Sequence, residues 1–278
     1  MTEPRRQDHV DAVVAAQDSA HSSEWDYDIG SPHLRHDSLR TMVERRLRDL
    51  VKASIDRGGS CNVLEVGAGH GTFTQCLLEA GATITVTEAS SDSADHLRRV
   101  FGDQIEVLHD KTGEQILESD AHWDLAIMTA VLHHIPDYLG FLERLTTLVD
   151  TGGTIFTVQD PLYYPRMGRT AHIADRGSYF AWRLVQGNYA HGLATRMRRL
   201  RGVYVDDNPS DLVEYHVVRD GVDEEAIAEL LRQHFDDVEI FRYWSTQAPI
   251  LQRLGERTRL ACTFGIEATG RGKPGVQD

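Results

Sequence analysis

Three glycines at alternate positions form the first group of residues whose type and spacing can bind a ligand. Gly67, Gly69 and Gly71 follow the mostly apolar segment 63–66. Because glycine has no Cβ, the backbone can approach a ligand to contact distance at such positions. A helix expected over 72–80 would direct its free N–H groups toward the same place. A glycine turn after the first strand of an α/β sheet predicts a nucleotide or nucleoside site.

Two adjacent histidines and an aspartate form the second group, which can carry acid–base chemistry. His133 and His134 follow the apolar segment 123–130, and Asp160 follows the segment 153–159. An alcohol oxygen is a poor nucleophile at neutral pH and needs a base, and an imidazole with an ordinary pKa of about 6.5 suits that role. Asp160 can hold a histidine in the required tautomer or accept a hydrogen bond from a second substrate hydroxyl. We expect His133 rather than His134 to be the base; structural roles for both are the alternative.

The elements that must position these residues alternate between strands and helices. Apolar and β-branched segments predict strands over 63–66, 82–88, 105–110, 123–130, 153–159, 238–245 and 259–268. Helical spacing of apolar residues predicts helices near 38–55, 72–80, 91–101, 138–148 and 223–235. This alternation is typical of a parallel sheet. We therefore expect an α/β fold, a doubly wound, Rossmann-like and mostly parallel seven-stranded sheet, with the polar residues above at the carboxyl ends of its strands.

The chain is predicted to consist of a tail, one domain and an insertion in that domain. Residues 1–22 are polar and without periodicity, which indicates a flexible tail before a single domain over 23–278. The alternation breaks over 161–222, where several aromatic residues predict a helical insertion after the fifth strand. In this fold such an insertion lies over the carboxyl ends of the strands and can form a pocket for a second substrate. Its aromatic residues can stack on sugar rings or form a small core of their own.

Composition excludes several classes of partner. The 278-residue chain has a net charge of −14, whereas a protein that grips nucleic acid usually has a basic surface. No apolar run reaches the roughly 20 residues that span a bilayer, and the charged start of the sequence lacks a secretory signal. Cys61, Cys76 and Cys262 are scattered, which fits small core residues in a reducing cytoplasm. We expect a cytoplasmic protein without nucleic-acid or membrane partners, and the choice between monomer and homodimer stays open.

The glycine spacing is similar to that of one known family. A dinucleotide fingerprint has the form G-x-G-x-x-G, but here Glu65 precedes glycines spaced as E-x-G-x-G-x-G. This form resembles motif I of the class I S-adenosylmethionine (SAM)-dependent methyltransferases, and the resemblance covers roughly residues 38–160. It implies that the cofactor is SAM, with S-adenosylhomocysteine (SAH) as its product. The cofactor would contact the acid and the turn, that is Glu65, Gly67, Ala68, Gly69 and Gly71.

The resemblance also implies cofactor contacts beyond the glycine turn. Glu88 lies about 20 residues past the glycines, where an acid can accept hydrogen bonds from two ribose hydroxyls, although a site for NAD shares this feature. Asp110 would face the adenine amino group, with a turn-capping acid as the alternative, and Thr129 would also contact the cofactor. Tyr27 would close over the cofactor as part of a lid, unless this segment only packs on the first helix.

The resemblance implies methyl transfer from a sulfonium to an acceptor. The arrangement of His133, His134 and Asp160 looks like that of actinobacterial sugar O-methyltransferases. We therefore expect methylation of a hydroxyl of a small polar acceptor, with a carbohydrate or glycosylated metabolite favoured. Methylation of a phenol, polyketide or amine, a SAM-binding cyclase that transfers no methyl group, and an NAD oxidoreductase are the alternatives. Two histidines and a carboxylate could also bind a divalent metal, but their spacing is not a recognised metal-ligand motif, so no metal is expected.

Overall fold

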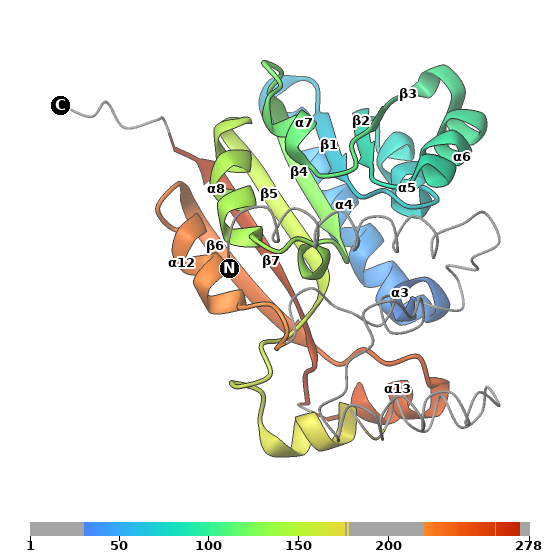
Figure 1. The fold of residues 1–278 in the computed structure, drawn as a ribbon, viewed down its shortest axis with the longest axis vertical. Coiled ribbons are helices and arrows are strands. Elements are labelled where there is room, and N and C mark those ends of the chain that lie inside the picture. Colours follow the sequence, from blue (N-terminus) through green and yellow to red (C-terminus); the bar gives the residue numbers. More distant parts are fainter. Residues whose placement is uncertain (1–30, 176, 178–219, 259, 273–278) are drawn as a thin grey trace, which may run out of the picture.

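Seven strands form one sheet in the computed structural model, which describes residues 31–175, 177, 220–258 and 260–272. The strands of this part of the chain are β1 (Asn62–Val66), β2 (Thr83–Glu88), β3 (Ile105–His109), β4 (Trp123–Thr129), β5 (Val149–Pro161), β6 (Phe235–Tyr243) and β7 (Thr263–Arg271). They lie in the order β3-β2-β1-β4-β5-β7-β6 (Figure 1). Strands β1 to β5 pair in parallel, and β7 runs antiparallel to both β5 and β6. The predicted mostly parallel, seven-stranded fold is confirmed.

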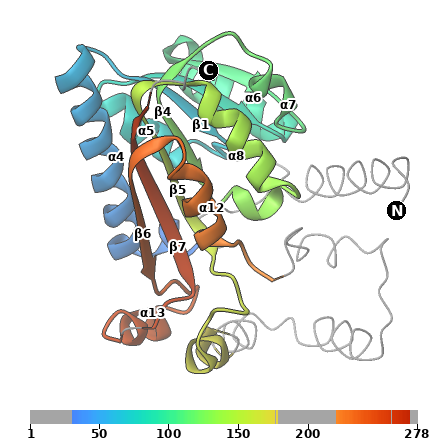
Figure 2. The same cartoon turned by 90° about the vertical axis from the view of Figure 1, so that its left-hand side faces the viewer.

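Helices cover both faces of the sheet. The helices whose two ends both lie in the described residues are α3 (Pro32–Arg35), α4 (Asp37–Gly58), α5 (Thr72–Glu79), α6 (Ser91–Phe101), α7 (Glu114–Leu117), α8 (Tyr138–Thr147), α12 (Glu224–Leu231) and α13 (Pro249–Gly255). Short 3-10 turns cover Gly102–Gln104 and Leu132–His134. Residues of α4, α5 and α6 share one apolar cluster, and residues of α7, α8 and α12 share the other. Figure 2 shows α4 on one side of the sheet and α8 and α12 on the opposite side.

The central strands are apolar because both of their faces are covered. In β4, the residues from Leu125 to Met128 are at most 1% exposed. Leu125 and Ile127 pack in the cluster of α4, α5 and α6, whereas Ala126 and Met128 pack in the other. Successive side chains of a strand point to opposite faces, so a strand with a helical layer on each side needs apolar residues throughout. Each large side chain buried in this way stabilises the fold by about 1.5–3 kcal/mol.

The ends of several elements differ from the sequence prediction. Helix α4 covers Asp37–Gly58 rather than the predicted 38–55, and His36 before it makes no side-chain capping hydrogen bond. The helix ends where Gly59 takes the left-handed conformation, with φ of 82°. Helix α12 ends at Leu231 rather than at the predicted residue 235, and Phe235 begins β6. The prediction was too long because Phe235 packs in the core and continues the apolar spacing of the helix.

The two stems of the predicted insertion lie side by side at the end of β5. Leu162 forms an isolated parallel bridge with Val222, and the backbone N–H of Tyr164 donates to the carbonyl of Asp220 at 2.7 Å. Residues 169–175 are helical. The remainder of 161–222 lies outside the described residues, as do the predicted tail 1–22 and Tyr27. Among the described helices, none combines the length and apolar character that crossing a membrane requires.

Candidate functional site

The glycine turn after β1 has the conformation that its sequence predicts. Gly67, Gly69 and Gly71 have φ of 69°, 58° and 83°, values that side chains with a Cβ rarely adopt. A Cβ on Gly67 would lie 2.7 Å from a methyl carbon of Val131, and one on Gly71 would lie 2.4 Å from the ring of Phe101. Only glycine therefore fits at Gly67 and Gly71, and the turn presents backbone rather than side chains to a ligand. Its contact with a cofactor stays a prediction.

Glu65 lies beneath the glycine turn, between β1 and α5. Its side chain is 3% exposed and accepts a hydrogen bond from the Thr74 hydroxyl at 2.6 Å. Burial raises the pKa of Glu65 to about 7, the Thr74 bond opposes the rise, and the nearby charge of Glu88 adds to it. The described contacts of Glu65 are therefore structural, and its predicted cofactor contact stays a prediction.

Glu88 joins the end of β2 to the glycine turn. One carboxylate oxygen accepts from the Gly69 N–H at 2.8 Å, and the other accepts from the Ser90 N–H at 3.1 Å. Burial raises the pKa of Glu88, and these N–H groups oppose the rise. Each carboxylate oxygen has two lone pairs, so the group can still accept from ribose hydroxyls. The geometry thus fits the predicted nucleoside contact while adding a role in holding the turn.

Asp110 and Thr129 occupy the ends of the strands on either side of β1 and β2. The Asp110 carboxylate accepts from the N–H groups of Gly113 and Ile116, both at 2.9 Å, and so begins α7. The structure thus supports the turn-capping alternative, with Asp110 buried rather than solvated. The Thr129 hydroxyl is buried and has no hydrogen-bond partner among the described residues. An unpaired buried hydroxyl is costly, and the predicted contact of Thr129 with the cofactor stays a prediction.

The structure brings His133 and Asp160 together at the carboxyl ends of β4 and β5. The His133 Nδ1 atom lies 2.8 Å from one Asp160 oxygen, which also accepts from the His133 backbone N–H at 3.1 Å. The Thr157 hydroxyl donates to the other Asp160 oxygen at 3.2 Å. A carboxylate at Nδ1 holds the proton on that atom and makes Nε2 the basic nitrogen. The rings of His133 and His134 lie 4.0 Å apart, centre to centre, and the His133 ring is held by the Asp160 carboxylate.

Two strained residues flank this histidine–aspartate pair. Ala130 has φ of 59° directly after β4, and Gln159 has φ of 78° within β5. They are the positive-φ residues other than glycine in the described chain. Such strain clusters at functional sites. Ala130 and Gln159 were not predicted from the sequence, because neither residue type marks a position where the backbone turns left-handed.

A model of a methyltransferase domain family matches residues 35–198, which is more than half of the chain. The chain belongs to this family. Among curated proteins, a ribosomal RNA small subunit methyltransferase A from Parabacteroides distasonis is 46% identical over 61 residues. That match covers 22% of this chain and 21% of the relative, so the chain spans about a fifth of the length of the curated relative it matches.

Solved structures of methyltransferases share the fold of this enzyme. The N-methyltransferase NodS from Bradyrhizobium japonicum WM9, in complex with SAH, has a TM-score of 0.51 and 14% identity, over 94% of this chain and 99% of that one. The plantazolicin methyltransferase BpumL, also with SAH, has a TM-score of 0.54 and 11% identity, over 97% and 99%. A putative sarcosine dimethylglycine methyltransferase from Galdieria sulphuraria has a TM-score of 0.53 and 13% identity, over 86% and 87%.

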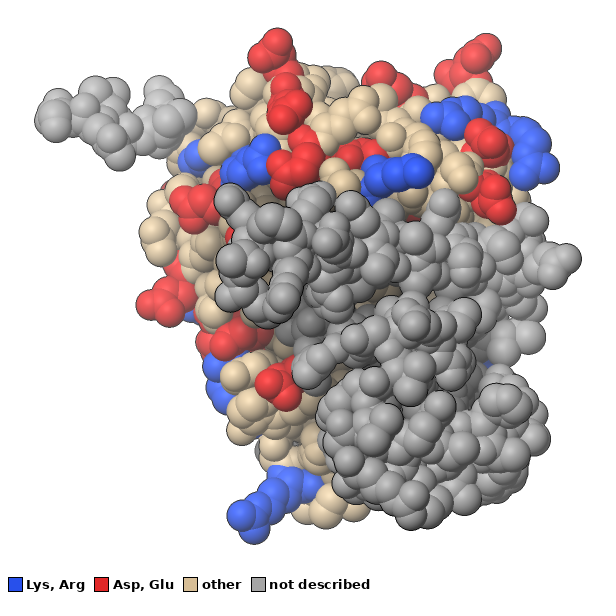
Figure 3. Space-filling model, in the orientation of Figure 1, with Lys and Arg blue, Asp and Glu red and all other residues tan. Residues whose placement is uncertain are grey.

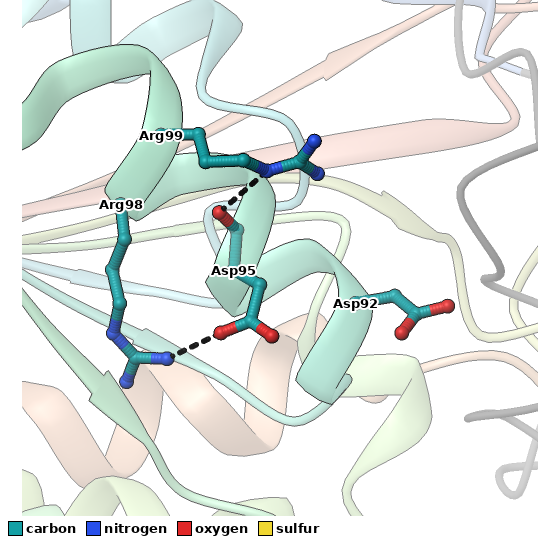
Figure 4. A pocket seen from close by; sticks show the side chains of 4 residues that line it. All are labelled: Asp92, Asp95, Arg98 and Arg99. Carbon is teal, nitrogen blue, oxygen red and sulfur yellow. Dashed lines mark hydrogen bonds and ion pairs between the residues drawn. The ribbon is translucent and has the colours of Figure 1, made fainter.

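The methyltransferase also has a surface hollow along α6. Its volume is about 410 Å³, and four charged residues of α6 line it: Asp92, Asp95, Arg98 and Arg99. Arg98 donates to the Asp95 carboxylate at 2.9 Å and Arg99 donates to the Asp95 carbonyl at 3.2 Å, whereas Asp92 points elsewhere (Figure 4). Because these groups belong to one helix and largely satisfy one another, the hollow is not a second candidate site.

The charges of the methyltransferase and its metal-binding capacity bear on possible ligands. On the face seen in Figure 3, acidic and basic side chains are interspersed rather than gathered into one basic patch. The basic segment 196–201 lies outside the described residues.

In the described part of the chain, no group of three or more histidine, cysteine or carboxylate side chains could hold a metal ion. Cys61, Cys76 and Cys262 are free and buried, as their predicted core role requires.

Proposed function

We propose that this methyltransferase transfers the methyl group of SAM to a hydroxyl of a small polar acceptor, with a sugar or glycoside as the favoured class. The observation that carries the proposal is the contact between His133 Nδ1 and the fully buried Asp160. A carboxylate that orients an imidazole in this way provides a general base, which oxygen acceptors require and amines need less.

Residues at the ends of β1, β2 and β4 are suited to hold the cofactor. When bound, SAM supplies a methyl carbon that is activated for attack by its positive sulfur. The glycine turn offers backbone to the ligand, Glu88 offers lone pairs to ribose hydroxyls, and the unpaired Thr129 hydroxyl gains a partner. These three observations support binding of a nucleoside at this edge of the sheet.

His133 then acts on the acceptor side of the site. Its Nε2 atom would take the proton of the acceptor hydroxyl, while the methyl group that this oxygen receives would come from the sulfonium of SAM, which would leave as SAH. Asp160 stabilises the resulting imidazolium through Nδ1 and keeps the ring oriented, and Thr157 holds the carboxylate in turn. Removal of a proton by a positioned base typically contributes about 10²- to 10⁴-fold to a rate. Alignment of the two substrates provides much of the remainder.

A methylation screen with active-site variants tests the proposal. The full-length chain is incubated with methyl-labelled SAM and a panel of glycosides, phenols and amines, and products are identified by mass. We expect a methyl ether on a glycoside, and a fall in kcat of about 10²- to 10⁴-fold in His133→Asn. His122→Asn is the matched control, because His122 is an exposed histidine outside the site. His134→Asn distinguishes the two candidate bases.

Three outcomes would contradict parts of the proposal. Transfer to an amine or carbon, with full activity in His133→Asn, would reject oxygen methylation with a histidine base. A larger loss in His134→Asn than in His133→Asn would assign the base to His134. A product without a gain in methyl mass would favour the cyclase alternative.

A further inference from the structure

Gln159 interrupts β5 with a bulge one residue before Asp160. Its φ of 78° is rare for a residue with a side chain. The pairing of β5 with β7 shifts register between Val158 and Asp160, so that Gln159 is the extra residue. A bulge of this kind changes the direction in which a side chain points and is common beside active sites. The bulge therefore gives the Gln159 side chain a direction that it would not have if β5 paired with β7 without a register shift.

The side-chain amide nitrogen of Gln159 is left unsatisfied by this arrangement. Its Nε2 atom is buried and has no hydrogen-bond partner among the described residues. Buried amide groups normally have partners, because an unpaired one loses the hydrogen bonds that water would provide. Strain and an unpaired buried amide thus coincide in one residue, beside the carboxylate that orients His133. Because strained residues cluster at functional sites, this combination points to a site that a ligand completes.

Two residues distant in sequence brace the bulge from inside the protein. The hydroxyl of Tyr243, on β6, interacts with the backbone of Gln159 and lies 2.6 Å from the His33 Nε2 atom. His33 is 2% exposed, and its ring meets the Tyr243 ring edge-on at 5.3 Å. Burial raises the pKa of Tyr243 well above its usual value and, with the charge of His36, lowers that of His33 to about 3. Both groups are therefore neutral near pH 7, so they hold the bulge by hydrogen bonding rather than by charge.

We propose that Gln159 determines acceptor specificity by binding a second hydroxyl of the acceptor, next to the hydroxyl that is methylated. This inference rests on the proposed function and narrows its acceptor class to vicinal diols. An amide can donate and accept, and so can a hydroxyl, so the two groups pair whichever amide atom faces inward. Gln159 is adjacent to Asp160, and the stem of the insertion begins two residues later at Pro161, so the proposal assigns Gln159 to the acceptor side of the strand ends.

A matched pair of acceptors with a side-chain variant tests this inference. The probes are the glycoside methylated in the screen above and its analogue in which hydrogen replaces the neighbouring hydroxyl. Gln159→Met keeps the length of the side chain and removes its hydrogen bonding, and Gln115→Met, at an exposed position of α7, is the control. We expect Gln159→Met to lower kcat/KM about tenfold to a hundredfold for the glycoside and little for the analogue.

Two further measurements separate this inference from the proposed function. Because Gln159→Met removes an unpaired buried amide, Tm should rise by about 2–4 °C, and calorimetry should show unchanged affinity for SAH. Equal losses with both acceptors, a lowered Tm, or weakened SAH binding would overturn the inference, and the last would place the amide on the cofactor. If no glycoside is methylated, the proposed function fails, and the Tm and SAH measurements still decide whether the amide is unpaired and faces away from the cofactor.

Discussion

Replacing Glu65 with glutamine should stabilise the methyltransferase far more at pH 8 than at pH 5. Glu65 is 3% exposed beneath the glycine turn, and burial raises its pKa from 4.5 to about 7, with Glu88 adding to the rise and Thr74 opposing it. The folded protein therefore holds this proton more tightly than the unfolded chain does. A neutral amide of the same shape keeps an acceptor for the Thr74 hydroxyl and never ionises.

The sign and size of the effect follow from the two pKa values. Below pH 4.5 both states of the chain are protonated at Glu65, and the favourable contribution of the neutral carboxyl is fully present. As the pH rises toward 7, the unfolded chain releases its proton first, so stability falls until the folded pKa is passed. The two values differ by about 2.5, and each pKa unit corresponds to about 1.4 kcal/mol, so the total loss is about 3 kcal/mol. About 2–3 kcal/mol of it falls between pH 5 and pH 8.

Urea unfolding at these two pH values measures the effect. The free energy of unfolding of Glu65→Gln minus that of the wild type should be about 2–3 kcal/mol larger at pH 8 than at pH 5. The two amide hydrogens of the new glutamine add a cost that does not depend on pH and cancels in this difference. Glu229→Gln is the matched control, because Glu229 is exposed on α12 and its carboxylate is already hydrated. Equal effects of Glu65→Gln at both pH values would show that Glu65 ionises normally and would refute the reasoning.

Three other substitutions test the turn, the histidine–aspartate pair and the core. Gly71→Ala places a Cβ 2.4 Å from the Phe101 ring; it should cost roughly 1–3 kcal/mol in urea unfolding and weaken SAH binding in calorimetry. Asp160→Asn should lower kcat by about 10²- to 10⁴-fold, because the carboxylate no longer orients His133, while calorimetry shows unchanged SAH affinity. Leu142→Ala, at a position that is 0% exposed, should cost about 2–5 kcal/mol in urea unfolding with unchanged SAH affinity.

Each of these expectations has an outcome that contradicts it. Wild-type stability in Gly71→Ala would mean that the Phe101 ring moves aside at little cost. Weakened SAH binding in Asp160→Asn would place the carboxylate on the cofactor rather than behind the base. A loss below the range for a removed core side chain in Leu142→Ala would mean that α8 closes over the space.

The parallel half of the sheet could be predicted because a strand that is buried on both faces is a continuous run of apolar residues in the sequence. The strands β1 to β4 are short apolar segments, and α4, α5, α6 and α8 carry apolar residues at helical spacing, so these elements were predicted within about three residues of the observed bounds, whereas the short α7 was not predicted. Helix α13 was missed, because it is short and holds its place through distant contacts, such as the hydrogen bond from Ser38 to Glu256 at 2.5 Å. The bulge at Gln159 depends on the pairing of β5 with β7, which no local sequence pattern indicates.

The candidate site was predicted in its residue types but not in its contacts. Three acids were expected to face the cofactor, yet the structure gives Glu65, Glu88 and Asp110 partners in the protein itself. The sequence does not show how two adjacent histidines are oriented toward Asp160. Their orientation depends on the 3-10 turn over Leu132–His134, which follows the strained Ala130. The contact of His33 with Tyr243 joins residues 210 positions apart, beyond the reach of any spacing argument.

The placement of β7 between β5 and β6 affects the order in which the chain can fold during synthesis. Strand β6 emerges from the ribosome before β7, the strand to which it bonds, and the free edge of β5 waits for the same strand. Until residues 263–271 have been translated, β5 presents an uncovered row of N–H and C=O groups to other nascent chains. Ribosome-bound intermediates of this enzyme are therefore open to mispairing at β5, and chaperone dependence should fall once this stretch has left the exit tunnel.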